Sequence, residues 1–299
     1  MNMSKTRKSL WAGAAIVAGL GAVVAALALS TAADVENFHR AVAQAGRRLP
    51  AASAGSDAWA GLPAPVQRYF RFTFGDAPTP ALAYVEVEMA GRFRRPGRTE
   101  FAPTTARQTL AAGTPALMFD ATTPVMPGVW ARAYDAYIDG RMEMKAKLLS
   151  AVALVDEKSS PELDRISLRR WLLESPLYPT ALLPGGPVRW EAVDAEHARA
   201  VVRRGGVSAS MLARFAPDGR LLHFAAEEDG DLETPYHGSG EFAARDDYRL
   251  VGGLRLPMRF RIARAAGGQR FPFWEGHVVR VRLHTAQGLA AQMEAGPPM

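Results

Sequence analysis

Short runs of alternating apolar and polar residues dominate the chain from about residue 80 onward. In residues 84–94, Val85, Val87 and Met89 alternate with charged side chains, and similar runs occupy 207–215, 254–262 and 279–283. Alternation with a period of two predicts strands that have one buried and one solvated face. Tight turns join these runs, and no regular strand–helix alternation occurs, which disfavours a parallel sheet. The pattern predicts a mainly β fold: an antiparallel meander forming a curved half-barrel or barrel with one or two inserted helices.

Residues 129–150 predict a hairpin around the dipeptide Asp139-Gly140, a favoured tight-turn sequence. Its register decides where Asp135 lies. A two-residue loop places Asp135 opposite Met144 on the apolar face, where a buried acid needs a partner. A three-residue loop instead turns the aromatic residues of the first strand inward and leaves Asp135 outside. We favour the second register because it buries aromatic rings and avoids an unpaired carboxylate.

Residues 160–174 carry the only strong helix signature of the predicted β region. Ser160, Pro161 and Glu162 form a cap, a first-turn proline and an early acid, and Pro176 ends the helix. Apolar residues surround its second half, which is more apolar surface than a helix exposed on one side requires. We therefore expect this helix to lie in the concavity of the curved sheet.

Candidate chemistry gathers at the end of this helix. Glu174 either forms an ion pair with Arg170, one turn earlier, or stands as a carboxylate at the rim of an apolar cavity. Trp171, Tyr178 and Trp190 either fill the core or line a ligand cavity. The candidate ligand-binding residues are Asp135, Arg170, Trp171, Glu174, Tyr178 and Trp190. No catalytic residue, metal ligand or cofactor is assigned.

The amino terminus predicts a membrane anchor. Lys5, Arg7 and Lys8 precede residues 10–30, which contain no charged side chain. About 20 apolar residues cross a bilayer, and the basic flank places the amino terminus in the cytoplasm. The prediction is a single-pass protein of the inner membrane whose body is periplasmic. A cleaved signal peptide is the alternative, because small residues occupy positions 30–33, but the apolar run exceeds a signal core of about 7–15 residues.

Four regions follow from these patterns. Residues 1–33 form the cytoplasmic tip and anchor, and residues 34–56 form an amphipathic helix ended by Pro50, lying on the headgroups, and a linker. Residues 57–285 form the β-rich domain, and residues 286–299 a flexible tail.

Composition removes several classes of protein. The chain has 299 residues and no cysteine, which excludes disulfides and thiolate chemistry. GxSxG, GxGxxG and HExxH motifs do not occur. The net charge is +6, and a basic strand face carries Arg255, Arg259, Arg261, Arg280 and Arg282. That face predicts either a solvated surface or contact with anionic lipid, and an exported location disfavours nucleic acid.

Several ordered segments resemble a bacterial family described only as a domain of unknown function. They are residues 169–174, 179–182 and 190–194, together with the earlier 62–69 and 135–140. The resemblance covers about residues 62–283 and implies no activity. A curved sheet with helices in its concavity is also similar to the periplasmic lipoprotein carriers, by fold analogy alone.

We rank three functions. The first is a membrane-tethered module that binds a lipid or another apolar small molecule in the concave face. The second is an envelope assembly factor that uses a strand edge or the basic face, and the third is an enzyme that uses Glu174. The sequence predicts no oligomeric state.

Overall fold

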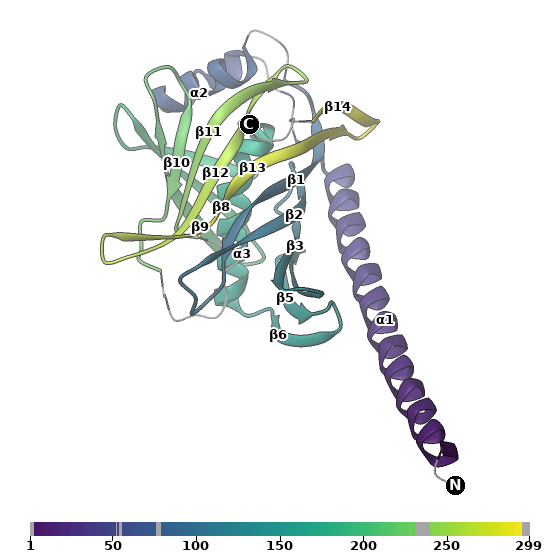
Figure 1. The fold of residues 1–299 in the computed structure, drawn as a ribbon. Helices are drawn as coiled ribbons and strands as arrows, with labels where there is room; N and C mark the ends of the chain where they lie inside the picture. The colour runs from purple at the N-terminus through teal and green to yellow at the C-terminus, as the bar shows by residue number, and fades with distance from the viewer. Residues whose placement is uncertain are drawn as a thin grey trace.

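A computed structural model describes residues 3–51, 53, 56–75, 79–230, 232 and 240–294. In this part of the chain, fourteen strands form one open antiparallel sheet that curves around a helix (Figure 1). The predicted mainly β class, the inserted helix and the long apolar helix before the sheet are confirmed.

The strands are β1 (Leu82–Arg94), β2 (Phe101–Ala111), β3 (Leu117–Met126), β4 (Val129–Ile138), β5 (Arg141–Leu148), β6 (Val152–Lys158), β7 (Val188–Ala192), β8 (His197–Arg204), β9 (Val207–Phe215), β10 (Leu221–Ala225), β11 (Phe242–Val251), β12 (Leu254–Ala266), β13 (Gln269–Thr285) and β14 (Gly288–Glu294). The helices are α1 (Met3–Arg48), α2 (Ala64–Phe74) and α3 (Pro161–Glu174), with short 3-10 turns η1 (Ser56–Trp59), η2 (Ser175–Leu177) and η3 (Pro179–Leu182).

Strand order follows the chain except at one place. The order is β6-β5-β4-β3-β2-β1-β13-β12-β11-β10-β9-β8-β7, and β14 pairs with β13. The first and last parts of the sheet therefore meet along β1 and β13. Gly91 faces Gly276 there, and a Cβ on Gly91 would lie 2.2 Å from the carbonyl oxygen of Glu275. Glycine at this position permits the close backbone approach.

Helix α3 fills the concave side of the sheet. Its cap matches the sequence signature, because the Ser160 hydroxyl accepts a hydrogen bond from the Leu163 N–H and Pro161 occupies the first turn. The helix contacts β4 and β5 as well as β8 and β9, which lie in opposite halves of the sheet. One helix can touch both halves only because the sheet curves around it. Trp171 and Leu172 are fully buried in this concavity.

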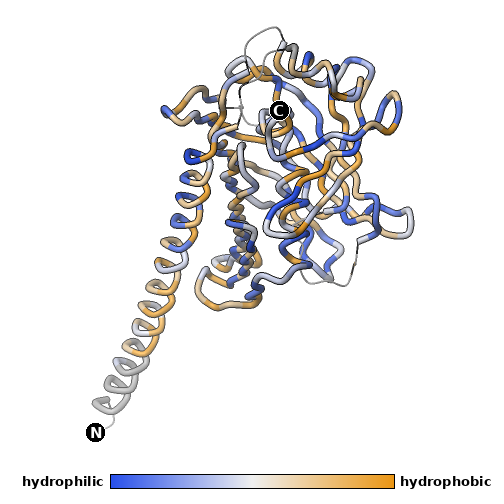
Figure 2. Tube along the Cα trace, turned by 180° about the vertical axis from the view of Figure 1, so that it is seen from behind, coloured by the Kyte–Doolittle hydropathy of each residue, from blue (hydrophilic) through white to orange (hydrophobic). Residues whose placement is uncertain are grey.

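Helix α1 continues without a break from its apolar first half onto the outer face of the sheet (Figure 2). We predicted that the segment after the span lies on lipid headgroups. Instead, Val35 and Val42 pack against Met118 and Tyr134, and the helix contacts β1, β2, β3 and β4. The predicted linker follows, although its residues 52, 54 and 55 lie outside the described residues.

A buried polar cluster joins α1 to the sheet. His39 Nε2 lies 2.9 Å from Oδ2 of Asp120, and His39 Nδ1 lies 2.7 Å from Oγ1 of Thr109. Arg132 binds the other Asp120 oxygen at 2.8 Å. At Gly46 the two backbones touch, since a Cβ there would lie 2.2 Å from the Ala83 carbonyl oxygen. These contacts fix the direction of α1 relative to the body.

The favoured register of the 129–150 hairpin was wrong. Ile138 pairs with Arg141, so the loop is the two-residue Asp139-Gly140 turn, and Asp135 lies opposite Met144. Both turn residues have positive φ, 53° and 81°, as a type I′ turn requires. The local argument failed because both faces of β4 are covered: α1 packs on the outer face, and α3 supplies a partner for Asp135 on the inner face.

The carboxyl-terminal tail is more ordered than we predicted. Residues 288–294 form β14, an added strand antiparallel to β13, while residues 295–299 lie outside the described part of the chain. The short helix α2, Ala64–Phe74, has proline in its first turn and packs its aromatic side chains into the main core.

Candidate functional site

Asp135 and Arg170 form a buried ion pair between the sheet and α3. Arg170 Nη1 lies 2.5 Å from Oδ2 of Asp135, and the two side chains are 5% and 3% exposed. The Arg170 guanidinium also lies 4.3 Å from the ring centroid of Phe119. An arginine at such a distance gains cation–π as well as ionic stabilisation. The pair explains why an acid is tolerated on the apolar face of β4.

Glu174 forms a salt bridge with Arg245, a partner that the sequence did not predict. Arg245 Nη2 donates to Oε2 of Glu174 at 2.7 Å, and Gln108 Nε2 donates to Oε1 at 3.3 Å. The predicted partner, Arg170, forms its salt bridge with Asp135. Arg245 also donates to the Leu173 carbonyl at 3.0 Å. Its charge at the carboxyl end of α3 offsets the unfavourable placement of an acid at that end of the helix dipole.

The three aromatic candidates lie in the core. Trp171 and Tyr178 are fully buried, with ring centroids 5.5 Å apart, and Trp190 is 8% exposed. Their polar atoms bind backbone carbonyls: Trp171 Nε1 donates to Ala111 at 2.9 Å, and Trp190 Nε1 donates to Leu182 at 3.0 Å. The Tyr178 hydroxyl donates to the Trp171 carbonyl, and burial raises the pKa of Tyr178 well above its usual value. This geometry is typical of packing.

An apolar pocket adjoins the two ion pairs. Its volume is about 70 Å³, and the acids Asp135 and Glu174 and the base Arg170 lie along it. The other lining residues are Phe93, Thr104, Phe119, Ala121, Thr123, Ala133, Tyr134, Met144, Ile262, Phe273 and Trp274. The site thus joins three of the six candidate residues to aromatic side chains from β1, β3 and β13.

A second charged cluster lies on the other side of α3. Glu241 accepts hydrogen bonds from Arg169 at 2.8 Å and from Arg264 at 2.9 Å, and its side chain is 1% exposed. Sequence reasoning missed Glu241 and Arg245 because β11 was not recognised as a strand. A signal was present: Glu241, Ala243 and Arg245 lie at a spacing of two, and all three are buried. An acid and a base on an inward face need partners from elsewhere in the fold.

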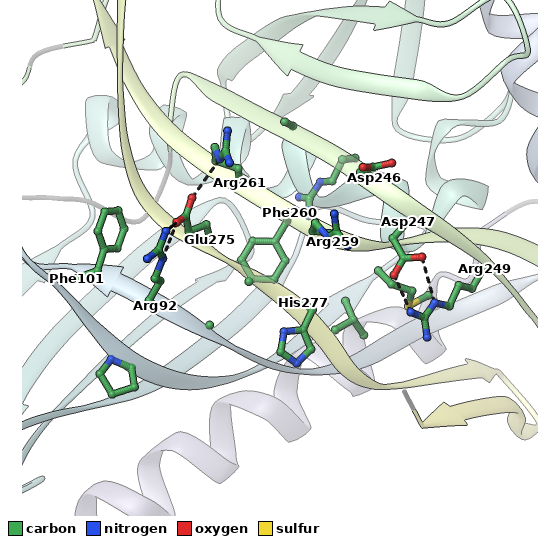
Figure 3. Close-up of a pocket in the computed structure, with 17 residues that line it drawn as sticks. Arg92, Phe101, Asp246, Asp247, Arg249, Arg259, Phe260, Arg261, Glu275 and His277 are labelled. Carbon is green, nitrogen blue, oxygen red and sulfur yellow. Dashed lines mark hydrogen bonds and ion pairs between the residues drawn. The ribbon is translucent and has the colours of Figure 1, made fainter. Parts of the chain in front are cut away.

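A larger hollow of about 1080 Å³ crosses β1, β2, β11, β12 and β13 (Figure 3). Charges of both signs line it: Arg92 and Arg261 bind Glu275 at 2.5 and 3.1 Å, and Arg249 binds Asp247 at 2.8 Å. Much of the basic face predicted from sequence is neutralised in the same way. Arg280 binds Glu88 at 2.9 Å, and Arg282 lies 3.5 Å from Glu86. Paired charges of this kind indicate a solvated surface.

The fold defines the class as an open, curved antiparallel sheet around a central helix, preceded by a long apolar helix that is a candidate membrane span. The chain belongs to a family of unknown function, DUF6920, whose family model matches residues 60–282. The predicted membership of a domain of unknown function is thereby confirmed. No curated protein matches the chain. No solved structure matches it either, so the likeness to lipoprotein carriers stays a prediction.

Proposed function

We propose that this chain is a single-pass protein of the inner membrane whose β domain, outside the cytoplasm, binds an apolar group of a lipid or small molecule. The anchor is α1. Its segment Ala15–Arg48 includes a window of mean hydropathy 2.2, and the cationic residues Lys5, Arg7 and Lys8 precede it. A basic flank of this kind stays on the cytoplasmic side.

The structure around the small residues at positions 30–33 favours an uncleaved anchor over a removed signal peptide. Residues 30–33 lie inside the continuous α1 helix, and Thr31 is fully buried. Its hydroxyl accepts a hydrogen bond from Lys147 Nζ at 2.8 Å. Proteases act on flexible segments, whereas residues 30–33 lie within a continuous helix. Intact mass spectrometry of the membrane-extracted protein tests this: a mass that lacks the first 30 or so residues contradicts the anchor.

The apolar pocket beside Asp135 and Arg170 carries the binding proposal. Aromatic walls with a few polar groups are typical of small-molecule sites. Its volume of about 70 Å³ is well below that of a cavity holding a whole drug-sized ligand, about 300–1,000 Å³. The pocket therefore takes one end or one group of a ligand, and the rest of the molecule stays outside. The concave face itself is occupied by α3.

The test is native mass spectrometry of the full-length, detergent-extracted protein. The substitution Ala133→Phe places a ring in the pocket, and Ala131→Phe is the matched control on the same face of β4, outside the pocket lining. We expect a bound molecule that accompanies the wild type and the control and is lost from Ala133→Phe. A wild type without bound molecules, or equal retention by all three proteins, contradicts the proposal.

The enzyme hypothesis has less support. Both carboxylate oxygens of Glu174 accept hydrogen bonds inside the core, and its side chain is 4% exposed. A general acid or base must reach its substrate directly or through one water. Such an environment favours a structural role for Glu174. The assembly hypothesis rests on the two ends of the sheet, β6 and β7, because edge strands can pair with another chain.

A further inference from the structure

Four large apolar side chains are exposed at one corner of the body. Met126 and Trp130 border the turn between β3 and β4, and Val152 and Leu154 belong to the neighbouring edge strand β6. Their exposed fractions are 60%, 38%, 54% and 62%. We name these four residues the apolar corner. An exposed group of apolar residues on a soluble surface is costly, so it indicates a partner.

The four residues of the apolar corner lie at the same end of strands β3 to β6. Pro124 pairs with Trp130 and Leu148 pairs with Val152 across neighbouring strands. The Leu149 N–H donates to the Trp130 carbonyl at 2.8 Å, and Trp130 Nε1 donates to the Ser150 hydroxyl at 3.0 Å. The indole therefore has its polar atom satisfied at the edge of the corner while much of its ring remains exposed. Tryptophan in this state is typical of membrane–water interfaces.

The position of α1 indicates that the partner of the apolar corner is the membrane. Lys147, on β5 beside the corner, binds Thr31 of α1. Thr31 directly follows residues 10–30, the uncharged run, and Leu27 and Leu29 at its end are 46% and 72% exposed. About 20 residues cross the hydrocarbon core, so Thr31 lies where the helix leaves the bilayer. The apolar corner lies at the same level.

This placement is rigid. Helix α1 is continuous, and its contacts at His39 and Gly46 hold it against the sheet. Figures 1 and 2 show β6 as the part of the body that extends farthest toward the amino-terminal half of α1. A body held in this way cannot turn its corner away from the membrane without breaking the buried contacts of α1.

We infer that the apolar corner inserts into the headgroup–acyl boundary of the same bilayer that α1 spans. This inference rests on the proposed anchoring by α1. The apolar side chains enter the boundary, and the lysine beside them keeps its ammonium at the level of the headgroups, as long cationic side chains do. The body is then a membrane-seated domain with one fixed face toward the lipid, rather than a domain on a flexible tether.

The chain contains no cysteine, so single cysteines can be labelled without further changes. Three variants of the full chain carry the fluorophore NBD at Leu154→Cys in the corner, Leu250→Cys on β11, and Leu20→Cys in the span. Leu250 is a matched control because it is an exposed leucine, 68% exposed, on a strand of the other half of the sheet. Each is reconstituted in vesicles of phosphatidylcholine and phosphatidylglycerol, with and without brominated acyl chains.

We expect blue-shifted emission and bromine quenching at positions 20 and 154, with position 154 about 5–10 Å into the boundary, and an aqueous, unquenched label at position 250. An aqueous label at 154 with a quenched label at 20 overturns the seated corner while the anchor stands. An unquenched label at 20 overturns the anchor and the corner together. A label at 154 that is shielded but unquenched by bromine places a protein there, which also overturns the inference.

Discussion

Arg170 on α3 and Asp135 on β4 are 35 positions apart in the chain, yet their side chains meet inside the protein with a nitrogen–oxygen distance of 2.5 Å. The contact joins the central helix to the first half of the sheet. The Glu174–Arg245 pair joins the same helix to β11 in the second half. The helix is thus held by buried ion pairs to both halves of the sheet, and its polar residues position it in the concavity.

Removing one partner of this pair should be costly. Asp135→Asn leaves the Arg170 charge buried beside a neutral amide, and we expect the free energy of unfolding to fall by about 3–5 kcal/mol. Asp135→Leu combined with Arg170→Met removes both charges and should recover much of that loss. Chemical denaturation of the detergent-solubilised protein measures both variants. A single variant within about 0.5 kcal/mol of the wild type would show that the pair contributes no more than a surface contact.

Gly46 should be required for the docking of α1. Gly46→Ala places a Cβ 2.2 Å from the Ala83 carbonyl oxygen. This contact is with backbone atoms of β1, so a side-chain rotation cannot relieve the clash. Alanine favours helices over glycine by about 1 kcal/mol, so propensity alone predicts stabilisation. We expect the opposite: a loss of about 1–3 kcal/mol from overpacking, with faster hydrogen exchange in residues 36–48.

Gly21→Ala is the matched control for that experiment. Gly21 lies in the same helix, and a Cβ there meets nothing within 4 Å. We expect normal exchange in residues 36–48 for this variant. If Gly46→Ala exchanges like Gly21→Ala, then α1 does not depend on the close approach to β1.

Docking of α1 should weaken in acid because of Asp120. Burial raises the pKa of Asp120, but hydrogen bonds and charges from His39 and Arg132 together lower it below the usual 3.8. A carboxyl whose pKa is lower in the folded state stabilises that state fully above the unfolded pKa, and this contribution is lost as pH falls through the folded pKa. Exchange in residues 36–48 should therefore rise below about pH 4.

The variant Asp120→Asn tests the origin of that acid effect. The amide cannot be titrated, so the variant should show weaker docking near neutral pH and little further change in acid. A wild-type pH profile in this variant would assign the acid effect to another group.

The buried imidazole of His223 leads us to expect a second range of pH-dependent stability. Burial, followed by the charge of Arg270, lowers the pKa of His223 from 6.5 to about 4. The unfolded chain binds this proton below pH 6.5, whereas the folded chain resists it, so stability should fall as pH drops from about 6.5 to about 4. Partial solvent screening makes the effect smaller than the full shift implies.

His223→Gln should flatten stability in that range, measured as the unfolding midpoint at pH values across the window. His277→Gln is the control, because His277 lines the larger hollow and is not among the groups whose charge lowers the pKa of His223. An equal slope in wild type and His223→Gln would contradict the assignment.

The register of the 129–150 hairpin and the strand β11 could not be predicted from local sequence patterns. Alternation of apolar and polar residues identifies the buried face of a strand only when the other face is exposed to solvent. Both faces of β4 are covered, one by α1 and the other by α3. Around β11, Arg245 and Glu241 interrupt the apolar face, so the strand resembles a polar loop. Their burial is explained by partners on α3 and β12, which no local window contains.

The sequence alone determined the mainly β class, the apolar first half of α1, the cap and concave position of α3, and the family. Each of these follows from local periodicity, capping residues or ordered motifs, which are properties of neighbours in the chain. Only the tertiary structure decided the partners of Asp135 and Glu174, the size of the pocket and the docking of α1. These depend on contacts between residues 35 to more than 80 positions apart, as in the pairing of His39 with Asp120, and such contacts arise from sheet curvature and burial.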